Sequence, residues 1–261
     1  MQPVKPEVFL IARPALDWDE VRRYLKGVGG EAWADRVQDR VADEEALVEF
    51  AGRVCYRSWE AGLNPNVTRV RTNSHVYLRN ILSSGHGSVL EHASYSFLFH
   101  HVSRVLTHEL VRHRAGVAVS QESLRFVRLS ELPFWFPDWA RGDALLMERA
   151  QAVLEQLEEF QGWMGDHFGL DSQGVSFHEK KHKTSFMRRF APEGVATDIL
   201  VTINIRALRH IIYMRTALGA EEEIRQVMDL VAERALAATP ALMQDYDPNQ
   251  DREWIPKFLK V

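Results

Sequence analysis

The strongest restriction on the fold is that two strand-like segments each run directly into a helix. Residues 93–99 alternate between aromatic side chains and Ser or Leu, which is the pattern of a strand with one buried face. A helical spacing of apolar residues follows over 102–110. Residues 198–205 are rich in β-branched side chains and lead into a helix expected over 206–218, with Gly219 as its stop. Such a chain must pack helices against a sheet.

Most of the remaining sequence has helical character. Helices are expected at 44–60, at 67–82 with an end at Gly85, at 143–168, and from the acidic residues 221–223 onward. Residues 8–12 fit either an edge or a central strand, and the aromatic, proline-containing segment 126–139 is expected to be a packed loop. We find no repeat, low-complexity linker or domain boundary. We therefore predict an α+β fold with a modest central β-sheet packed with several long helices, and a single domain over residues 1–261.

Composition excludes several classes of protein. Hydrophobic residues make up 46% and charged residues 26% of the chain, as in ordinary globular proteins. No run approaches the roughly 20 apolar residues of a membrane span, and residues 1–6 do not resemble a signal peptide, so we expect a cytoplasmic protein. The net charge of −4 indicates no general nucleic-acid or membrane surface. Positive charge is instead local, which points to a discrete anionic ligand.

The chain has a single cysteine, Cys55. One cysteine excludes an intramolecular disulfide and a cysteine-based metal cluster. The segment around it is typical of an apolar helix face. We therefore expect Cys55 to be a small buried core residue rather than a nucleophile.

Positive charge gathers in residues 112–125. Three arginines, one histidine, two serines, a glutamine and a glutamate stand in this segment. Arginine forks match the paired oxygens of phosphate and other planar anions, and neighbouring polar groups can bind the uncharged part of the same ligand. The competing interpretation is a basic helix terminus, with Arg112–Arg114 in the last helical turn, followed by a polar loop.

A second informative place is the helix expected after Asn204. Its apolar stripe, formed by Ile205, Leu208 and Ile212, continues into Arg215. A guanidinium on a buried stripe needs a partner, because burying it unpaired costs several kcal/mol. That partner is either an acidic side chain of the protein or a substrate anion. Arg206 and His210 are four residues apart and therefore share a face of the same helix.

The turn at residues 86–92 contains two histidines and a glutamate. One interpretation is a metal site, but the spacing lacks the usual pattern of metal-binding histidines on regular elements, so we predict no metal. Glu91 and His92 are also expected to cap a helix or brace a loop, and we do not assign catalysis to either.

Together these three places resemble the flavin-dependent thymidylate synthases, over about residues 55–225. The family signature has Arg-His-Arg, commonly seven residues, then Ser-x-Arg; here eight residues separate Arg112-His113-Arg114 from Ser123-Leu124-Arg125-Phe126. The turn matches the family's His-x-Ser/Thr-x-x-Glu-His block. The later helix matches its Asn-x-Arg block through Asn204, Arg206, His210 and Met214-Arg215. Gly219 stands where the family often has a histidine.

The resemblance implies roles for individual residues. The implied FAD-binding residues are His86, Ser88, Arg112, His113, Arg114, Gln121, Asn204, Arg206 and His210. The implied dUMP-binding residues are Glu109, Arg112, Gln121, Ser123, Arg125, Arg188 and Arg215. Arg188 stands four residues before Pro192, with Arg189 beside it as the alternative. Arg215, which would lie against the uracil and favour its ionised form, is the implied catalytic residue.

The resemblance also implies the reaction. Methylenetetrahydrofolate would give a one-carbon unit to dUMP, FADH2 would reduce the adduct to dTMP, and NADPH would reduce the flavin again, without a protein nucleophile. The sites would lie between subunits of a homotetramer. Two rivals remain: a metal-dependent nucleotide phosphohydrolase that uses His86, Glu91, His92 and His113, and a non-catalytic nucleotide- or flavin-binding relative. The longer spacer and Gly219 are the features that keep the second rival open, and both rivals rank below the synthase interpretation.

Overall fold

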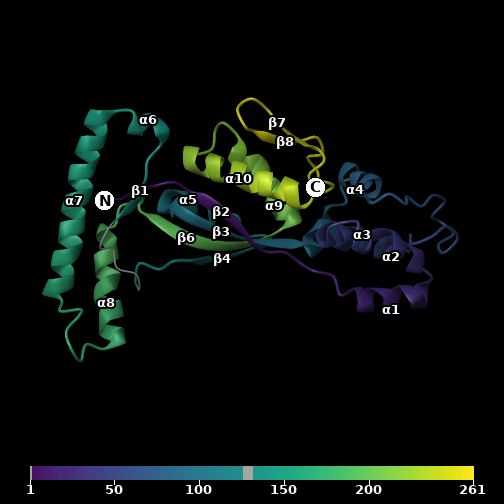
Figure 1. Ribbon diagram of the computed structural model, residues 1–261, viewed down its shortest axis with the longest axis horizontal. Coiled ribbons are helices and arrows are strands. Elements are labelled where there is room, and N and C mark those ends of the chain that lie inside the picture. The colour runs from purple at the N-terminus through teal and green to yellow at the C-terminus, as the bar shows by residue number, and fades with distance from the viewer. Residues whose placement is uncertain (1, 126–131) are drawn as a thin grey trace.

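The computed structural model describes residues 2–125 and 132–261 and confirms the α+β fold (Figure 1). At its centre is a four-stranded antiparallel sheet in the order β2-β3-β6-β4. Its strands are β2 (Glu7–Ala12), β3 (Ser94–Ser103), β6 (Ala196–Asn204) and β4 (Val117–Gln121). Two small sheets pair β1 (Gln2–Val4) with β5 (Pro133–Trp135), and β7 (Tyr246–Pro248) with β8 (Trp254–Pro256).

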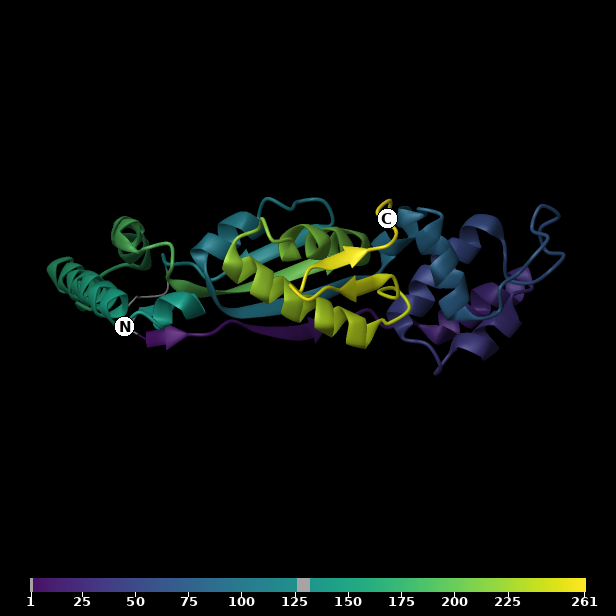
Figure 2. The ribbon, with the colours of Figure 1, turned by 90° about the horizontal axis from the view of Figure 1, so that it is seen from above.

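The helices gather in three places along an elongated molecule (Figures 1 and 2). One end holds α1 (Trp18–Val28), α2 (Glu31–Val37), α3 (Asp43–Tyr56), α4 (Ser74–Ser83) and the 3-10 helix η1 (Gly87–His92). The other end holds α6 (Asp138–Arg141), α7 (Ala144–His167), α8 (Phe177–Met187) and η2 (Arg188–Phe190). Near the sheet lie α5 (Arg104–Leu110), α9 (Ile205–Thr216) and α10 (Glu222–Ala238). Within the described residues we find no helix that has the length and apolar character needed to span a membrane.

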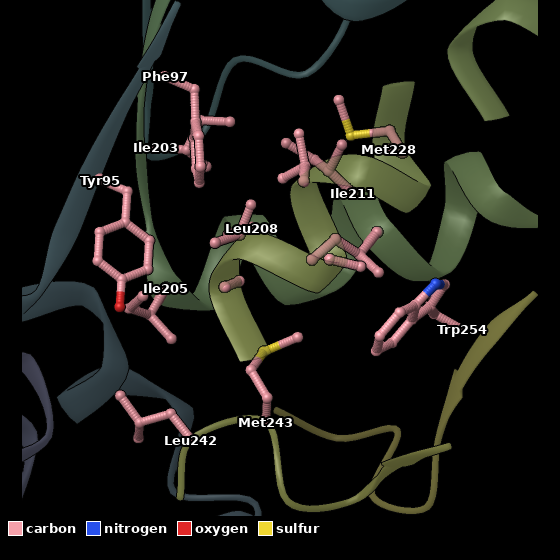
Figure 3. Packing of buried hydrophobic residues seen from close by; sticks show 14 of the residues in the cluster. Tyr95, Phe97, Ile203, Ile205, Leu208, Ile211, Met228, Leu242, Met243 and Trp254 are labelled. Atoms are coloured by element: carbon pink, nitrogen blue, oxygen red, sulfur yellow. The ribbon is translucent and has the colours of Figure 1, made fainter. Parts of the chain in front are cut away.

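The main core lies between the central sheet and the two helices α9 and α10. Tyr95 and Phe97 of β3 and Ile203 of β6 pack toward Leu208 and Ile211 of α9 (Figure 3). Burial alternates along β3, as the sequence pattern predicted. A second apolar cluster joins α1, α2 and α3. The single-domain organisation stays a prediction.

Both strand-to-helix junctions end in a capping side chain. Ser103, the last residue of β3, accepts the backbone N–H of Leu106, and Asn204, the last residue of β6, accepts that of Ala207 at 2.8 Å. Such N-caps satisfy donors that the first helical turn leaves unpaired. The chain therefore passes from strand to helix without a linker, and each junction has a fixed geometry.

Several predicted boundaries were wrong for local reasons. The helix expected at 102–110 begins only at Arg104, because β3 continues to Ser103. The helix expected at 67–82 begins at Ser74, where Asn73 caps it. The helix expected at 44–60 ends at Tyr56, because Arg57 adopts the left-handed conformation (φ 46°).

Two segments expected as loops contain regular structure. Residues 117–121 form edge strand β4, which pairs with β6 along its whole length. In the segment 126–139, residues 126–131 lie outside the described part of the chain. The rest contains strand β5 and the start of α6.

The expectation that Cys55 is buried was wrong. Cys55 is exposed, as are Val54 and Tyr56 beside it in the last turn of α3. The buried face of this helix instead carries a charged pair, Glu49 and Arg53, both fully buried. Apolar composition alone therefore did not identify the face that packs.

A buried carboxyl group joins α10 to the start of α5. Glu223 is fully buried and accepts the backbone N–H of Ser103 at 2.7 Å and the hydroxyl of the same residue. Burial raises the pKa of Glu223 from 4.5 to about 7. The protonated form therefore fits the folded protein better than the ionised form.

This carboxyl group should make stability depend on pH. Because the folded pKa is higher than the unfolded one, its contribution is complete below pH 4.5 and is lost as the pH rises through about 7. The shift corresponds to about 3 kcal/mol of unfolding free energy. Denaturant unfolding at several pH values should show this decline, and Glu223→Gln should remove it. An unchanged slope in the variant would contradict the assignment.

Candidate functional site

The main candidate site is a cavity of about 710 Å³ where η1, the loop before β4, the start of α9 and the last three residues meet. Its lining residues are Glu91, Arg112, His113, Arg114, Ala115, Gly116, Asn204, Arg206, Ala207, His210, Ile211, Leu259, Lys260 and Val261. Six of the predicted flavin-binding residues therefore lie together, although they come from distant parts of the chain.

The Arg112–Arg114 segment lies after the end of α5 rather than in its last turn. The helix ends at Leu110, whose carbonyl accepts the backbone N–H of His113 at 3.0 Å. The interpretation of these residues as a basic helix terminus was therefore wrong. The chain then turns at Gly116, which has a φ of 69°, a value that suits glycine. This turn directs the segment toward α9.

Gly116 also lets the turn touch Asn204. The backbone N–H of Asn204 donates to the Gly116 carbonyl at 2.9 Å, and a β-carbon on Gly116 would lie 2.2 Å from the Asn204 amide nitrogen. The Asn204 side chain is already used, because it caps α9. Because Gly116 has no side chain, the turn before β4 can approach the start of α9 closely, and these are the two sides of the cavity.

Gly116→Ala should weaken flavin binding by about tenfold or more, because the alanine is strained at this φ and displaces the Asn204 cap. Titration of the purified apoprotein with FAD, followed by fluorescence, measures the effect. The matched control is Gly62→Ala, where φ is also positive (90°) but the added β-carbon meets no atom within 4 Å. Equal affinities in both variants would contradict the packing argument.

The α9 side of the cavity is braced by η1. Arg206 donates to the Glu91 carboxylate at 2.6 Å, and a β-carbon at Gly87 would lie 2.8 Å from Arg206 Nε. The bracing role expected for Glu91 is therefore confirmed. His210, one turn after Arg206, lies edge-to-face with His113 across the cavity, with 6.3 Å between ring centroids.

His86 and Ser88 are not part of the cavity lining. His86 lines a neighbouring cavity of about 270 Å³, with its ring 5.7 Å from that of Tyr56. Arg69 and Arg71 line the same space. Ser88 is exposed on η1 beside Gly87. The turn therefore approaches the main cavity through Gly87 and Glu91 rather than through the two residues that the signature indicated.

Arg215 is half-buried and contacts His113, which lines the main cavity, and Glu109, which lines a smaller one. Its guanidinium donates to the Glu109 carboxylate, to the Glu109 carbonyl at 3.0 Å and to His113 Nε2 at 2.9 Å. Of the two partners left open by the sequence, the acidic side chain is the one observed. Glu109 and Arg112 line the smaller cavity of about 270 Å³, and Arg112 also lines the main one. Arg112 and the Arg215 cluster thus connect the two cavities.

The His113 ring is held in the neutral form. Burial, followed by the charge of Arg215, lowers the pKa of His113 below its usual 6.5. A neutral ring can accept the Arg215 N–H through its Nε2 lone pair, which a protonated ring cannot do. His113 therefore orients Arg215 and adds no positive charge of its own near neutral pH.

The remaining predicted residues lie at the far end of β4. Gln121, the last residue of that strand, donates to the Thr107 hydroxyl at 3.2 Å, and Ser123 accepts the backbone N–H of Arg125 at 3.4 Å. The five residues of β4 separate this end from the Arg112–Arg114 turn by about 17 Å at roughly 3.3 Å per residue. The structure therefore forms two groups of predicted residues rather than one.

Sequence reasoning missed two cations. Arg104 donates to the Glu122 carbonyl at 3.2 Å, and burial, opposed by the charge of Glu122 and assisted by that of Arg188, lowers its pKa. Arg104 thus lies close to the predicted phosphate ligand Arg188. Lys260 lines the main cavity. No local pattern could have indicated either residue, because only the fold brings them to these places.

The metal-site interpretation of the 86–92 turn receives no support. Within residues 2–125 and 132–261, one set of three or more potential metal ligands converges, and it consists of Glu7, His100 and His101. His86, Glu91, His92 and His113 form no such set in the described chain. The described residues therefore give no support for the metal centre on which the phosphohydrolase hypothesis depends.

Comparisons with known proteins identify the family of the chain. The family model described as thymidylate synthase complementing protein matches residues 36–241. A flavin-dependent thymidylate synthase of Mycobacterium sp. (strain KMS) is 39% identical over 212 residues, covering 77% of this chain and 80% of that protein.

Solved structures extend the likeness to the fold. The UMP/dUMP methylase PolB from Streptomyces cacaoi, bound with 5-Br UMP, aligns with a TM-score of 0.58 at 18% identity and covers 93% of this chain and 94% of that one. Thymidylate synthase X from Helicobacter pylori, with FAD and dUMP, gives 0.52 at 20% identity and covers 77% and 90%. At such identities the structural likeness concerns the fold alone.

Proposed function

The chain belongs to the flavin-dependent thymidylate synthase family, and on that premise we propose that it converts dUMP to dTMP. The carbon donor is 5,10-methylenetetrahydrofolate, FAD carries the hydride, and NADPH is the reductant. The observation that carries the proposal is the cavity in which Arg112, Arg114 and Arg206 meet the rings of His113 and His210. Those groups match a ligand that is anionic at one part and flat at another.

The residues of this cavity suit FAD. Its volume of about 710 Å³ lies within the usual range for ligand sites. Arginine forks match diphosphate oxygens, and Lys260 adds a fourth cation to the lining. FAD supplies the hydride chemistry when bound, while the protein orients the reactants and adjusts the charges around them. We assign direct flavin contacts to the predicted residues that line the cavity. His86 and Ser88, which lie outside the lining, are assigned to positioning the turn beside it.

Arg215 provides the charge that the pyrimidine needs. A fixed guanidinium stabilises negative charge on the uracil ring when the base ionises, and it requires no rearrangement at that moment. Glu109 and neutral His113 hold the guanidinium in one orientation. Since Glu109 and Arg112 line the smaller cavity beside Arg215, we place the base of dUMP there.

The phosphate of dUMP is assigned to the other end of β4. Ser123, Arg125 and Arg188 belong to that group, and Arg104 joins them. Because the five residues of β4 separate this group by about 17 Å from the Arg112–Arg114 turn of the main cavity, we infer that each complete site combines the two groups from different copies of the chain, as in a homotetramer. The sheet face opposite α9 and α10 carries Phe9, Leu98 and Leu200 in register across three strands, and it offers apolar surface for such an assembly.

The first experiment is an absorbance spectrum of the purified protein, followed by NADPH oxidation with and without dUMP. The proposal expects a flavin band and oxidation that dUMP stimulates, with dTMP formed when methylenetetrahydrofolate is added. A parallel assay with UMP in place of dUMP tests whether the chain accepts the ribonucleotide, as the name of the UMP/dUMP methylase PolB suggests for that protein. A colourless protein that neither binds FAD nor oxidises NADPH would contradict the proposal. Bound flavin without dUMP-dependent turnover would instead support a non-catalytic relative.

The exposed position of Cys55 calls for its own control. A thiolate nucleophile is the alternative way to activate dUMP, and an exposed thiol is accessible for such chemistry. Cys55 is outside the lining of both cavities that contain Arg112. Cys55→Ser is therefore expected to keep the wild-type rate of dTMP formation, whereas a loss of about a hundredfold or more would point to covalent catalysis.

A further inference from the structure

A pair of histidines lies in a β-bulge far from the proposed flavin cavity. Phe99 pairs with Ile199 and Val102 with Thr197, so His100 and His101 together face the single residue Asp198. His101 has a φ of 57°, in the left-handed region that only a few per cent of non-glycine residues adopt, with histidine among the more frequent of them. Bulges and strained residues of this kind concentrate at functional sites. The bulge and the conformation of His101 therefore mark this part of the sheet as a candidate site.

The bulge places three potential metal ligands together. The two histidine rings lie with 3.5 Å between centroids and are tilted by 32° to each other, and His100 pairs in register with Glu7 on the neighbouring edge strand β2. One ligand atom from each of Glu7, His100 and His101 lies within 4.8 Å of the others. Atoms bonded at about 2.1 Å to one tetrahedral ion lie roughly 3.4 Å apart, so binding would require these atoms to approach by at most about 1.4 Å.

Asp198 orients this group. Its carboxylate oxygen is 2.8 Å from His100 Nδ1 and accepts the backbone N–H of His101 at 3.3 Å. A carboxylate on Nδ1 fixes the proton there and leaves the Nε2 lone pair for a metal, which is the arrangement found behind many metal-bound histidines. The same contact holds the bulge in place. In the single chain both histidines are partly exposed, so an ion and a water ligand can approach them.

We propose that Glu7, His100 and His101 bind one divalent transition-metal ion, with Zn²⁺ as the expected ion and Asp198 as the residue that orients His100. Two imidazoles and one carboxylate suit Zn²⁺, whereas Mg²⁺ and Ca²⁺ prefer oxygen ligands alone. The ion would fasten edge strand β2 to β3. This site is independent of the flavin cavity, because Asn204 in that cavity pairs with Ser94 at the opposite end of β3.

Calorimetric titration of the untagged full chain with ZnCl2 at neutral pH tests the proposal. We expect one ion per chain, and a thermal unfolding midpoint that rises with Zn²⁺ and returns with a chelator. His100→Ala should abolish stoichiometric binding, and Asp198→Asn should weaken it by about tenfold. The control is His178→Ala, which removes an exposed histidine of α8 and should leave binding unchanged.

His101→Gly separates loss of a ligand from loss of the fold. Glycine accepts the left-handed conformation, so the metal-free variant should unfold at or above the wild-type temperature. In that variant added Zn²⁺ should no longer raise the midpoint. Absence of stoichiometric Zn²⁺ binding to the wild type, or binding that survives both His100→Ala and His101→Gly, would overturn the proposal.

Discussion

Replacing Arg215 with alanine is expected to lower the rate of dTMP formation by at least about a hundredfold. The physical reason is that a fixed positive charge beside an ionising base stabilises the reaction by an amount comparable with the loss of one oxyanion-hole donor. In this chain the charge is held by Glu109 and by neutral His113, so its position is set before substrate binds. Steady-state rates with saturating dUMP and methylenetetrahydrofolate measure the effect.

A matched set of variants separates this electrostatic role from a structural one. Arg215→Lys keeps the charge but loses the fork that contacts Glu109 and His113 together, so it should recover only part of the rate. Arg234→Ala removes an exposed arginine of α10 and should change nothing. Flavin affinity and the unfolding temperature should change far less than the rate. If Arg215→Ala turned over at the wild-type rate, the ion pair with Glu109 would be purely structural.

Acidification should act on the same cluster. The pKa of His113 is lowered in the folded protein, so its contribution to stability is complete above pH 6.5 and decreases as the pH falls below that value. Protonation removes the acceptor for the Arg215 N–H and places two cations together. We therefore expect the rate to fall on the acid side and His113→Asn, which keeps a neutral side chain, to flatten that limb of the profile.

The sequence predicted the central elements because local and long-range requirements agree there. The alternation in 93–99 and the β-branched run in 198–205 match the buried faces of β3 and β6. Strand β4 was missed because its residues were interpreted as part of a ligand-binding loop, although Val117 and Val119 alternate with Ala118 and Ser120. An edge strand depends on a neighbour, here β6, that no local pattern identifies.

The longer spacer also has a physical meaning in the structure. Residues 115–122 consist of the Gly116 turn, strand β4 and Glu122. An extra residue inside β4 would move every following side chain to the other face of the sheet. The one extra residue relative to the common family spacing therefore fits best in the turn at Gly116 or directly after Gln121. This leaves the register of β4 with β6 intact, and with it the position of Ser123.

The convergence of the site depended on contacts that sequence patterns do not encode. Arg206 and His210 were expected on one helix face, and both line the cavity. Arg104 and Lys260 enter the two groups only through folding, and His86, the residue directly before η1, lines a neighbouring cavity. Residue types indicated the chemistry of the ligand. The separation of the predicted ligand-binding residues into two groups, one at each end of β4, follows from the way the strand is placed in the sheet.

Asp245→Asn is expected to destabilise the protein by about 3–5 kcal/mol, because it leaves a buried guanidinium without its counter-charge. Asp245 and Arg209 are 2% and 1% exposed, and two N–H groups of Arg209 donate to the two carboxylate oxygens at 2.8 and 2.9 Å. The same guanidinium lies 4.7 Å from the centre of the Tyr246 ring. For a chain of this size the unfolding temperature should fall by roughly 10 °C.

The control for this prediction is Asp35→Asn. Its ion pair with Arg22 has the same 2.8 Å separation but is exposed, so the loss should stay below about 1 kcal/mol. The Asp245 carboxylate also accepts the backbone N–H of Phe258 at 3.2 Å, and its backbone carbonyl accepts that of Lys257 at 3.0 Å, directly before the residues that line the proposed flavin cavity. Weaker flavin binding should therefore accompany the lost stability in Asp245→Asn and be absent in Asp35→Asn. Equal destabilisation in both variants would mean that burial does not set the strength of the Arg209 pair.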